Sequence, residues 1–389
     1  MRVGIVGLGF RLELLAKVFA ATVPEFRLVG YVDPEPAGLP GLIKAGIDPG
    51  RAYDNIDDLV GAEKLDLLMI GSPNHLHLDH LRIALKHDIR IFCEKPIVTT
   101  IEDTFELLKL LRDHGGPDRV IVGLVLRYAP LYVDLVKTLA EGTLGEVASI
   151  EASEHIAPYH GAFFMRDWRR YQDYSGSFML EKCCHDLDLY QGVMGARAMR
   201  VASFGGRKSF TPKNANNLDQ TVYHRKPSGW MGTTRVFDSD ADIIDHQTAI
   251  VEYANGASMA FHTNLNVPNH FRRFCVVGTK GTAEGDFVRN YYRVSDAHSE
   301  KVLADKSYEI SGLSVHYGAD EQMIADVVEH LRHGTKLPVS VLDALEAGIT
   351  AIKIDEARRT RTVVDLAPVW QVYDSLLAPA ERAKTGGAA

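Results

Sequence analysis

Residues 3–12, with the sequence VGIVGLGFRL, decide how the N-terminal part of the chain folds. The apolar run before Gly7 predicts a buried strand, the Gly-x-Gly pair a tight turn, and residues 12–21 a helix. Residues 27–32 predict a second strand, which Asp33 follows. A strand, a glycine turn, a helix and a second strand that ends on an acid occur in this order in dinucleotide-binding units.

Each part of this unit has a role in holding a dinucleotide. Gly7 and Gly9 let backbone amides approach the pyrophosphate, and the helix N-terminus at Phe10 and Arg11 adds partial positive charge. Asp33 lies 21 residues past Leu12, close to the roughly 20-residue spacing of an acid that binds the ribose hydroxyls. A carboxylate would repel the 2′-phosphate of NADP, so we expect NAD, although Arg11 leaves NADP open.

Two features weaken the glycine pair as a signal. A Gly-x-Gly pair also occurs in ordinary tight turns that bind no nucleotide, which is the alternative interpretation here. Leu12 stands where the third glycine of the fingerprint is expected. Because that glycine serves close packing of the helix on the strand, we expect Leu12 to displace the helix slightly outward.

Composition limits the classes of partner and location. The 389 residues, 46% of them hydrophobic, suffice for two to three domains. A net charge of −8 gives no reason to expect nucleic acid or an anionic membrane, so we expect small molecules and other copies of the chain as partners. The first strand leaves no room for a signal peptide, and no apolar run approaches the roughly 18 residues of a membrane span. We therefore expect a cytoplasmic protein, and its four cysteines, without Cys-x-x-Cys spacing, to be reduced.

The rest of the chain divides into two patterns. In the first pattern, strands alternate with helices, which predicts an α/β domain with a doubly wound parallel sheet over residues 1–124. Its further strands are expected at 65–70, 89–93 and 120–125, and its helices at 78–86 and 101–113.

In the second pattern, strands follow one another, which predicts a C-terminal α/β domain with a large, mainly antiparallel open sheet over residues 125–377. Its strands are expected at 146–154, 199–204, 248–265, 272–277, 281–288 and 291–294, and two late helices at 319–332 and 341–360.

Three local features complete this pattern. Asn255-Gly256 predicts a hairpin within residues 248–265. Residues 206–246 form either a solvated loop or a lid over the site. Residues 378–389 have the composition of a flexible tail.

Glu94-Lys95-Pro96 directly follows a strand of the parallel sheet. Ligands bind beyond the carboxyl ends of such strands, so Lys95 is expected near the nicotinamide end of the dinucleotide. There a lysine can hydrogen-bond a reacting hydroxyl and stabilise charge on its oxygen. A surface lysine in a loop is the alternative.

A second candidate for chemistry is the run EKCCHDLDL over residues 181–189. On a helix, Glu181, His185 and Asp188 share one face, and Lys182 lies nearby. Carboxylates would fix the tautomer of His185 and raise its pKa, which suits proton abstraction from an alcohol. A solvated charged face is the alternative, but two cysteines and two leucines interleave the charges and favour burial.

Two further polar clusters could carry chemistry. The first resembles a metal cluster and consists of His75, His77, Asp79 and His80. A helix would spread these side chains apart, so we expect no metal. The turn at Pro73 and Asn74 is expected under the cofactor. A second cluster comprises His160, Arg166, Trp168 and Arg169. Its indole could stack on a sugar ring while an arginine binds an anionic group. A structural arginine network is the alternative.

Taken in order, these motifs resemble the Gfo/Idh/MocA oxidoreductase family over nearly the whole chain. The resemblance is carried by Gly7-Leu8-Gly9, Ser72-Pro73-Asn74-x-x-His77, Glu94-Lys95-Pro96, Gly142-Thr143-Leu144-Gly145-Glu146-Val147 and the helix ending in His185-Asp186-Leu187-Asp188. It implies a Rossmann domain, a second α/β domain on an open sheet, and a homodimer or homotetramer formed through that sheet. It also implies NAD(P)-dependent redox chemistry on sugars, cyclitols and related polyols.

The resemblance also assigns roles to residues. It implies that Lys95 and an Asp-x-x-x-His pair, here Glu181 and His185, contact the reacting hydroxyl; Glu181 departs from the usual aspartate. The cofactor contacts implied by the motifs are Ser72, Pro73, Asn74, His77, Glu94 and Lys95. The substrate contacts expected are Lys95, Arg127, His160, Arg166, Trp168, Arg169, Lys182, His185 and His316.

Three functions are compatible with these residues. The first is a dehydrogenase that moves hydride from a secondary hydroxyl of a sugar, cyclitol or glycoside to NAD, with Lys95 polarising the oxygen and His185 as general base. The second is an NAD-dependent glycosidase, on a substrate that could be an anionic sugar, in which transient oxidation, elimination and re-reduction give net hydrolysis without net NADH. The third, a dinucleotide sensor with a dead site, is disfavoured because Lys95 and His185 are both present.

Overall fold

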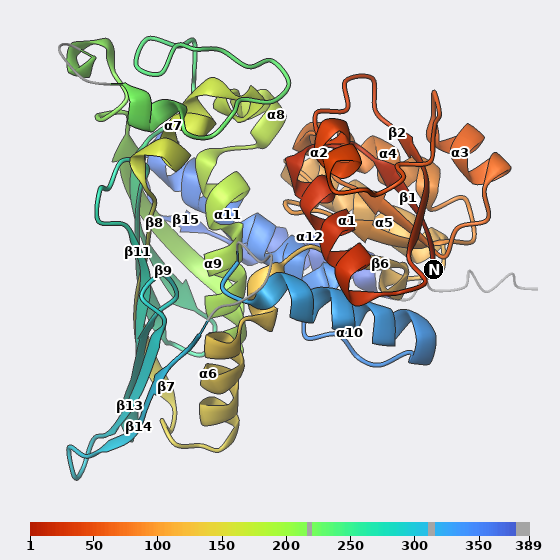
Figure 1. The fold of residues 1–389 in the computed structure, drawn as a ribbon. Coiled ribbons are helices and arrows are strands. Elements are labelled where there is room, and N and C mark those ends of the chain that lie inside the picture. Colours follow the sequence, from red (N-terminus) through yellow and green to blue (C-terminus); the bar gives the residue numbers. More distant parts are fainter. Residues whose placement is uncertain (216–219, 310–315, 379–389) are drawn as a thin grey trace, which may run out of the picture.

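The computed structural model describes residues 1–215, 220–309 and 316–378. Its N-terminal part is a parallel sheet with the order β3-β2-β1-β4-β5-β6 and helices on both faces (Figure 1). The strands are β1 (Arg2–Val6), β2 (Arg27–Val32), β3 (Arg51–Ala52), β4 (Leu67–Ile70), β5 (Arg90–Cys93) and β6 (Val120–Val122). The helices are α1 (Phe10–Thr22), α2 (Leu39–Lys44), α3 (Ile56–Ala62), α4 (His77–Ala84) and α5 (Ile101–Asp113). The prediction of a doubly wound α/β sheet is confirmed.

The leucine at the third glycine position has a local explanation. Leu12 is fully buried, and a Cβ added at Gly71, after β4, would lie 2.5 Å from Leu12 Cγ. The absence of a side chain at Gly71 thus makes room for the Leu12 side chain, so that α1 can pack on the sheet without a glycine at position 12. The turn keeps its shape because Gly7 has φ +83°, and a Cβ there would lie 2.3 Å from the Ser72 nitrogen.

The second part is a mixed, mainly antiparallel sheet with the order β14-β13-β12-β11-β7-β10-β9-β8-β15. Only β7 and β10 pair in parallel among these neighbours. Its strands are β7 (Val147–His155), β8 (Ala198–Gly206), β9 (His246–Tyr253), β10 (Ser258–Asn264), β11 (Phe271–Gly278), β12 (Gly281–Asp286), β13 (Tyr291–Asp296), β14 (Val302–Ser307) and β15 (Val364–Asp365). Asn255-Gly256 joins β9 to β10, as the hairpin signal predicts.

The remaining helices lie on the side of this sheet that is turned toward the parallel sheet, and α10 runs along the parallel part (Figure 1). They are α6 (Pro130–Ala140), α7 (Pro158–Arg166), α8 (Gln172–Ser175), α9 (Phe178–Met194), α10 (Ala319–His333), α11 (Val341–Thr360) and α12 (Ala367–Leu377). α9 packs on β7 and α11, while α10 packs on α1 and α12 on α5. The late helices therefore join the two parts, and α9 faces the carboxyl ends of the parallel strands.

Several elements were not predicted, although the sequence carries their signals. α6 and α7 begin at Pro130 and Pro158, and α12 has Pro368 in its first turn, which is where proline favours a helix start. The long segment between β8 and β9 contains only short 3-10 helices, Pro212–Asn214 and Thr221–His224, among its described residues. Further 3-10 turns lie at Asn74–Leu76, Pro117–Arg119, Val125–Tyr128 and Trp168–Arg170.

No described helix covers the far face of the large sheet in Figure 1. Phe204 of β8 and Ile250 of β9 are 74% and 51% exposed there, while neighbouring positions on these strands are buried. An apolar exposed sheet face is typical of a surface that another chain covers. The homo-oligomer expected from the sequence stays a prediction.

Candidate active site

The glycine turn between β1 and α1 fits a dinucleotide. Gly9 is the N-cap of α1 and has an extended backbone. A Cβ added at Gly9 would have no atom within 4 Å, so the space beside this residue is open. An open glycine beside unpaired N–H groups of a helix start is the arrangement that receives a pyrophosphate. Asp33 ends β2, accepts a hydrogen bond from the Glu35 nitrogen at 2.8 Å, and has a pKa raised by burial. Phe10 is 39% exposed beside this turn.

Arg11 connects the glycine turn to two other segments. Its Nε donates to Glu94 Oε1 at 2.8 Å and its Nη1 to Asp320 Oδ1 of α10 at 2.7 Å. The guanidinium is thus held by two carboxylates of the chain. The possibility that Arg11 serves a 2′-phosphate therefore loses its basis in this structure.

The segment after β4 is buried beneath the site and is tied to α9. Asn74 Nδ2 donates to Glu181 Oε2 at 2.7 Å. The two ring nitrogens of His77 lie 2.9 Å from the Ser72 carbonyl and 2.8 Å from the Pro96 carbonyl. His77 therefore joins the Ser72-Pro73-Asn74 turn to the Glu94-Lys95-Pro96 segment. Within the described ranges, no three His, Cys, Asp or Glu side chains are grouped to hold a metal ion.

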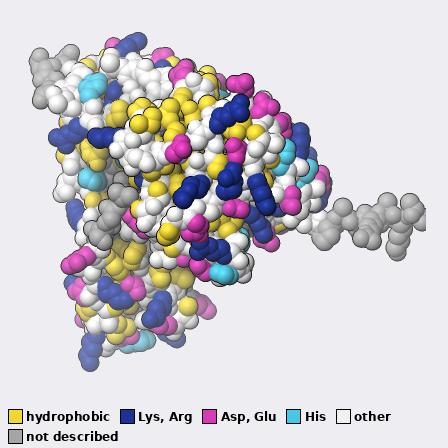
Figure 2. Space-filling view, turned by 45° about the vertical axis from the view of Figure 1, so that its right-hand side comes forward, with side chains coloured by type: hydrophobic (Ala, Val, Ile, Leu, Met, Phe, Trp, Pro, Cys, Tyr) yellow, Lys and Arg dark blue, Asp and Glu magenta, His cyan; other side chains and the backbone are white. Residues whose placement is uncertain are grey.

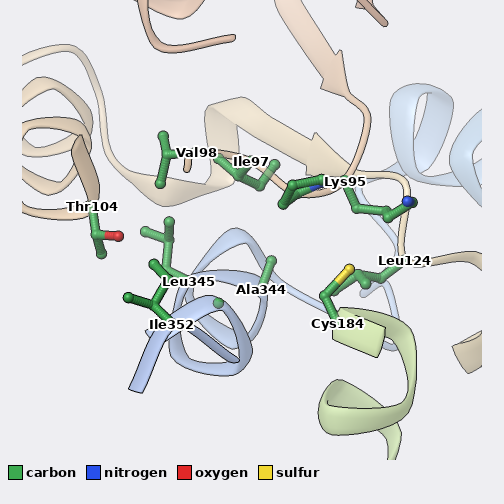
Figure 3. Close-up of a pocket in the computed structure, with 11 residues that line it drawn as sticks. Lys95, Ile97, Val98, Thr104, Leu124, Cys184, Ala344, Leu345 and Ile352 are labelled. Carbon is green, nitrogen blue, oxygen red and sulfur yellow. The ribbon is translucent and has the colours of Figure 1, made fainter. Parts of the chain in front are cut away.

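Lys95 extends from the end of β5 toward α9. Its Nζ donates to the Glu181 carbonyl oxygen at 2.7 Å and lies 3.7 Å from Glu181 Oε2. Figure 3 shows the apolar surroundings on the other side of its backbone, where Ile97, Val98, Leu124 and Cys184 contribute to a small cavity. The ammonium points away from that cavity, so the apolar packing anchors the backbone while the charge faces the cleft.

Glu181 is the centre of a charge cluster at the start of α9. It is 4% exposed, and its Oε1 accepts from Arg169 Nε at 2.7 Å. Burial by itself would raise the pKa of Glu181, but Lys95, Arg169 and the hydrogen bond from Asn74 outweigh it and lower that pKa. The carboxylate is therefore ionised and compensates the two cations beside it.

His185 lies one helical turn after Glu181 and is 5% exposed. Its pKa is well below the ordinary value because burial disfavours the charged ring, and Lys95 and Arg272 add repulsion. The expectation that carboxylates raise this pKa is wrong, because the nearby acids are already paired with cations. Among the described residues, His185 Nδ1 is buried without a hydrogen-bond partner. A neutral imidazole beside the Lys95 ammonium can accept a proton.

His316 approaches His185 from the segment before α10. Their ring centroids lie 6.0 Å apart, and His316 Nδ1 lies 3.0 Å from Asp320 Oδ2. Burial lowers the pKa of His316 more than Asp320 raises it. Two histidines from distant segments therefore meet at one place, and Asp320 orients the second one.

The opposite side of α9 carries a second charge cluster that faces the large sheet. Arg272 of β11 donates to both carboxylate oxygens of Asp186, at 2.8 and 2.6 Å, and its Nε lies 2.8 Å from Glu154 Oε2. Glu154 also pairs with Lys182 at 2.8 Å. All four side chains are largely buried, so α9 is not a solvated charged face.

The arginines expected at the substrate have partners within the chain. Arg169 binds Asp167 and Glu181, and it lies 4.2 Å over the ring of Trp168, which is 6% exposed. Arg166 Nη2 donates to the Lys226 carbonyl at 2.7 Å. Arg127 forms a two-point pair with Asp188 at 2.8 and 2.7 Å. One face of Trp168 is thus covered by Arg169, and Arg127 holds α9 in place.

His160 lies in α7, surrounded by cations. Burial, together with the charges of Lys182, Lys226, His316 and Arg169, places its pKa well below the ordinary value. It is therefore a neutral hydrogen-bonding group near the second histidine. Its position, with that of Lys182, agrees with a place at the substrate, which stays a prediction.

Sequence reasoning missed several residues of this site. Glu154 and Arg272 lie on neighbouring sheet strands, and Lys226 comes from a loop. No local pattern marks them, because only the tertiary packing brings them close to α9 and α7. Asp186 carried a weak signal, since it lies within the charged run of α9.

The molecular surface and helices add two observations. On the face seen in Figure 2, basic and acidic side chains are intermixed and form no single basic stripe. Of the helices in the described ranges, none has the length and apolarity to cross a bilayer.

Comparison with known proteins agrees with the fold and the cofactor turn. Residues 1–123 match the model of an oxidoreductase family with an NAD-binding Rossmann fold, and residues 136–366 match the C-terminal alpha/beta domain of the same family. YteT of Bacillus subtilis (strain 168) is 22% identical over 82% of this chain and 85% of its own. The 2,7-anhydro-N-acetylneuraminate hydratase of Mediterraneibacter gnavus is 23% identical over 67% of this chain and 60% of its own.

A solved structure shows the same arrangement of elements. Levoglucosan dehydrogenase in complex with NADH and levoglucosan superposes with a TM-score of 0.76 at 18% identity, covering 94% of this chain and 99% of that one. At this identity the likeness concerns the fold. Because both family models match, and together span most of the sequence, the chain belongs to the Gfo/Idh/MocA family of NAD-binding Rossmann-fold oxidoreductases.

Proposed function

We propose that this protein oxidises a secondary hydroxyl of a sugar, cyclitol or glycoside with NAD, using Lys95 to polarise the oxygen and His185 as general base. One observation carries the proposal. The Lys95 ammonium binds the helical turn that precedes His185, and this places a cation beside a buried neutral imidazole at the carboxyl ends of the parallel strands. Bound NAD supplies the hydride acceptor at this place.

The residues divide the work of such an oxidation. The hydroxyl proton passes to neutral His185, and Lys95 donates a hydrogen bond to the oxygen as it gains carbonyl character. Glu181 keeps Lys95 in position through the backbone of α9, and Asn74 and Arg169 hold the Glu181 carboxylate. His316, oriented by Asp320, lies close enough to His185 to contact a neighbouring hydroxyl of the same substrate.

A second function uses the same first step. In a redox-neutral glycosidase, oxidation to a ketone is followed by loss of an α-proton and of the leaving group, addition of water, and reduction of the ketone. His316 supports this alternative, because the elimination needs a base for the α-proton in addition to the base that takes the hydroxyl proton, and this second neutral histidine lies beside His185. The hydratase named among the relatives is consistent with such chemistry.

One experiment separates these functions. Purified protein is incubated with NAD and a panel of sugars, cyclitols and glycosides, while NADH absorbance and released sugar are followed together. A dehydrogenase accumulates NADH in proportion to ketone, whereas a redox-neutral glycosidase releases sugar without net NADH. If neither product forms while NAD binds tightly, the dinucleotide-sensor interpretation holds and both enzymatic proposals fail.

A further inference from the structure

Lys226 differs from the other cations of the cleft. Lys95, Lys182 and Arg169 each have a carboxylate partner in Glu181 or Glu154. Within residues 1–215, 220–309 and 316–378, Lys226 Nζ has no carboxylate at ion-pair distance, and it lies 5.1 Å from the centroid of the Phe163 ring. Among the described residues, Lys226 is therefore the one of these four cations without an ion-pair partner.

The surroundings of Lys226 disfavour an isolated charge. Burial and the nearby charges of Lys182 and Arg169 lower the pKa of Lys226 to about 8, and the opposing effect of Asp167 is smaller. Holding an ammonium out of water beside like charges costs free energy unless an anion accompanies it. An anionic group on a ligand would supply the missing partner.

The loop that carries Lys226 holds it over α7. Its carbonyl accepts from Arg166 Nη2, and a few residues on, Gly229 donates to Asp167 Oδ2 at 3.0 Å. A Cβ at Gly229 would lie 3.8 Å from the Phe10 ring, so the same loop reaches the dinucleotide-binding turn. The loop that carries Lys226 thus extends from α7, where Lys226 lies, to the first residue of α1.

A neutral hydrogen-bonding group lies close to this ammonium. The Phe163 ring lies next to both groups, with its centroid 5.1 Å from Lys226 Nζ and 6.5 Å from the His160 ring centroid. Burial and the charges of Lys182 and Lys226 keep the pKa of His160 low, so its ring is neutral. A monoanion with two oxygen atoms could accept hydrogen bonds from Lys226 and from His160 together. Its single negative charge would equal the single positive charge of Lys226. These properties favour a carboxylate over a dianionic phosphate.

We propose that Lys226 and His160 form a carboxylate-binding subsite, so that the substrate is a carboxylated sugar and Lys226 determines that specificity. The inference rests on the proposed function, since it names the substrate class of the same cleft. It replaces Arg169 as an expected anion ligand, because Glu181 and Asp167 already bind that guanidinium, and it gives Arg166 the role of holding the Lys226 carbonyl.

The test measures ligand binding separately from turnover. Isothermal titration in the presence of NAD compares D-glucuronate, D-galacturonate and N-acetylneuraminate, each with its own methyl ester, and includes glucose 6-phosphate as a dianion. The variants are Lys226→Met, which keeps the length and removes the charge, and Lys226→Arg, which keeps the charge. Lys213→Met is the control, because Lys213 is an exposed lysine of the same loop.

In the wild type, at least one acid is expected to bind about tenfold or more tightly than its ester. Lys226→Met removes this preference by weakening the acid and not the ester, Lys226→Arg retains it, and Lys213→Met leaves it unchanged. The inference is overturned if no acid exceeds its ester, if Lys226→Met keeps the preference, or if glucose 6-phosphate binds better than every acid.

The outcomes also separate this inference from the proposed function. Lys226-dependent binding of an acid that yields neither NADH nor a cleaved product supports the subsite and contradicts the oxidation. NADH formation from neutral sugars at rates that Lys226→Met does not alter supports the oxidation and contradicts the subsite.

Discussion

The cofactor turn and the cleft around α9 are built in different ways. The turn is a continuous stretch of chain that offers backbone groups to a dinucleotide, and its shape depends on Gly7 and Gly9. The cleft is assembled from side chains of at least five separate elements, and buried ion pairs hold them. A local sequence pattern can therefore specify the first region, whereas long-range packing specifies the second.

The largest expected effect concerns the ion pairs beneath α9. Arg272→Met leaves Asp186 buried without its cation and Glu154 with Lys182 alone, which is expected to lower the free energy of unfolding by about 3–5 kcal/mol. Urea denaturation measures this change. Arg273→Met, at the next position of β11 and 51% exposed at its side chain, is the matched control and should change stability by roughly 0.5 kcal/mol or less. Equal losses in both variants would show that the pairs contribute little.

A slightly smaller effect is expected where the two regions meet. Lys95→Met should lower kcat by about 10²–10³-fold, since it removes one donor to the reacting oxygen, while NAD affinity changes little. Steady-state kinetics and fluorescence titration with NADH measure the two quantities. Lys86→Met serves as the control, because Lys86 is an exposed lysine of the same domain. Unchanged turnover in Lys95→Met would remove the lysine from the mechanism.

The two glycines of the turn should respond differently. Gly9→Ala meets no atom of the chain and has an ordinary φ of −87°, so it should leave thermal stability unchanged and weaken NAD binding by about tenfold or more. Gly7→Ala meets the Ser72 backbone at positive φ and should lower the unfolding temperature. Thermal unfolding and NAD titration of both variants test this contrast. It fails if Gly9→Ala destabilises the protein as much as Gly7→Ala.

The smallest effect is a displaced pH profile. A base with a lowered pKa stays neutral until the pH falls through that lower value, so the acid limb of kcat/KM should lie below the ordinary histidine value of about 6.5. The profile of the wild type with a turned-over substrate measures it. In His185→Gln, any residual activity should lack this limb. An acid limb above the ordinary value would mean that His185 is not the titrating base.

Much of the fold could be predicted from the sequence because its signals are local. Hydrophobic periodicity and caps located α5 and α11, and Thr100 does accept a hydrogen bond from the Asp103 nitrogen. The start of α6 at Pro130 was available as a signal and was not used. By contrast, the pKa of His185 could not be predicted, because it depends on how deeply α9 is buried and on which cations its acids meet.

The sequence by itself determined the dinucleotide-binding unit, the two-sheet organisation and the approximate positions of Lys95 and His185, because these depend on backbone geometry and short-range periodicity. Only the tertiary structure decided that Glu181, Asp186 and Asp188 are each committed to buried cations, and that His185 is neutral. It also decided that Lys226, unlike Lys95, Lys182 and Arg169, has no carboxylate at ion-pair distance among the described residues. Electrostatic interactions act between atoms close in space, and the residues that carry them here are far apart along the chain.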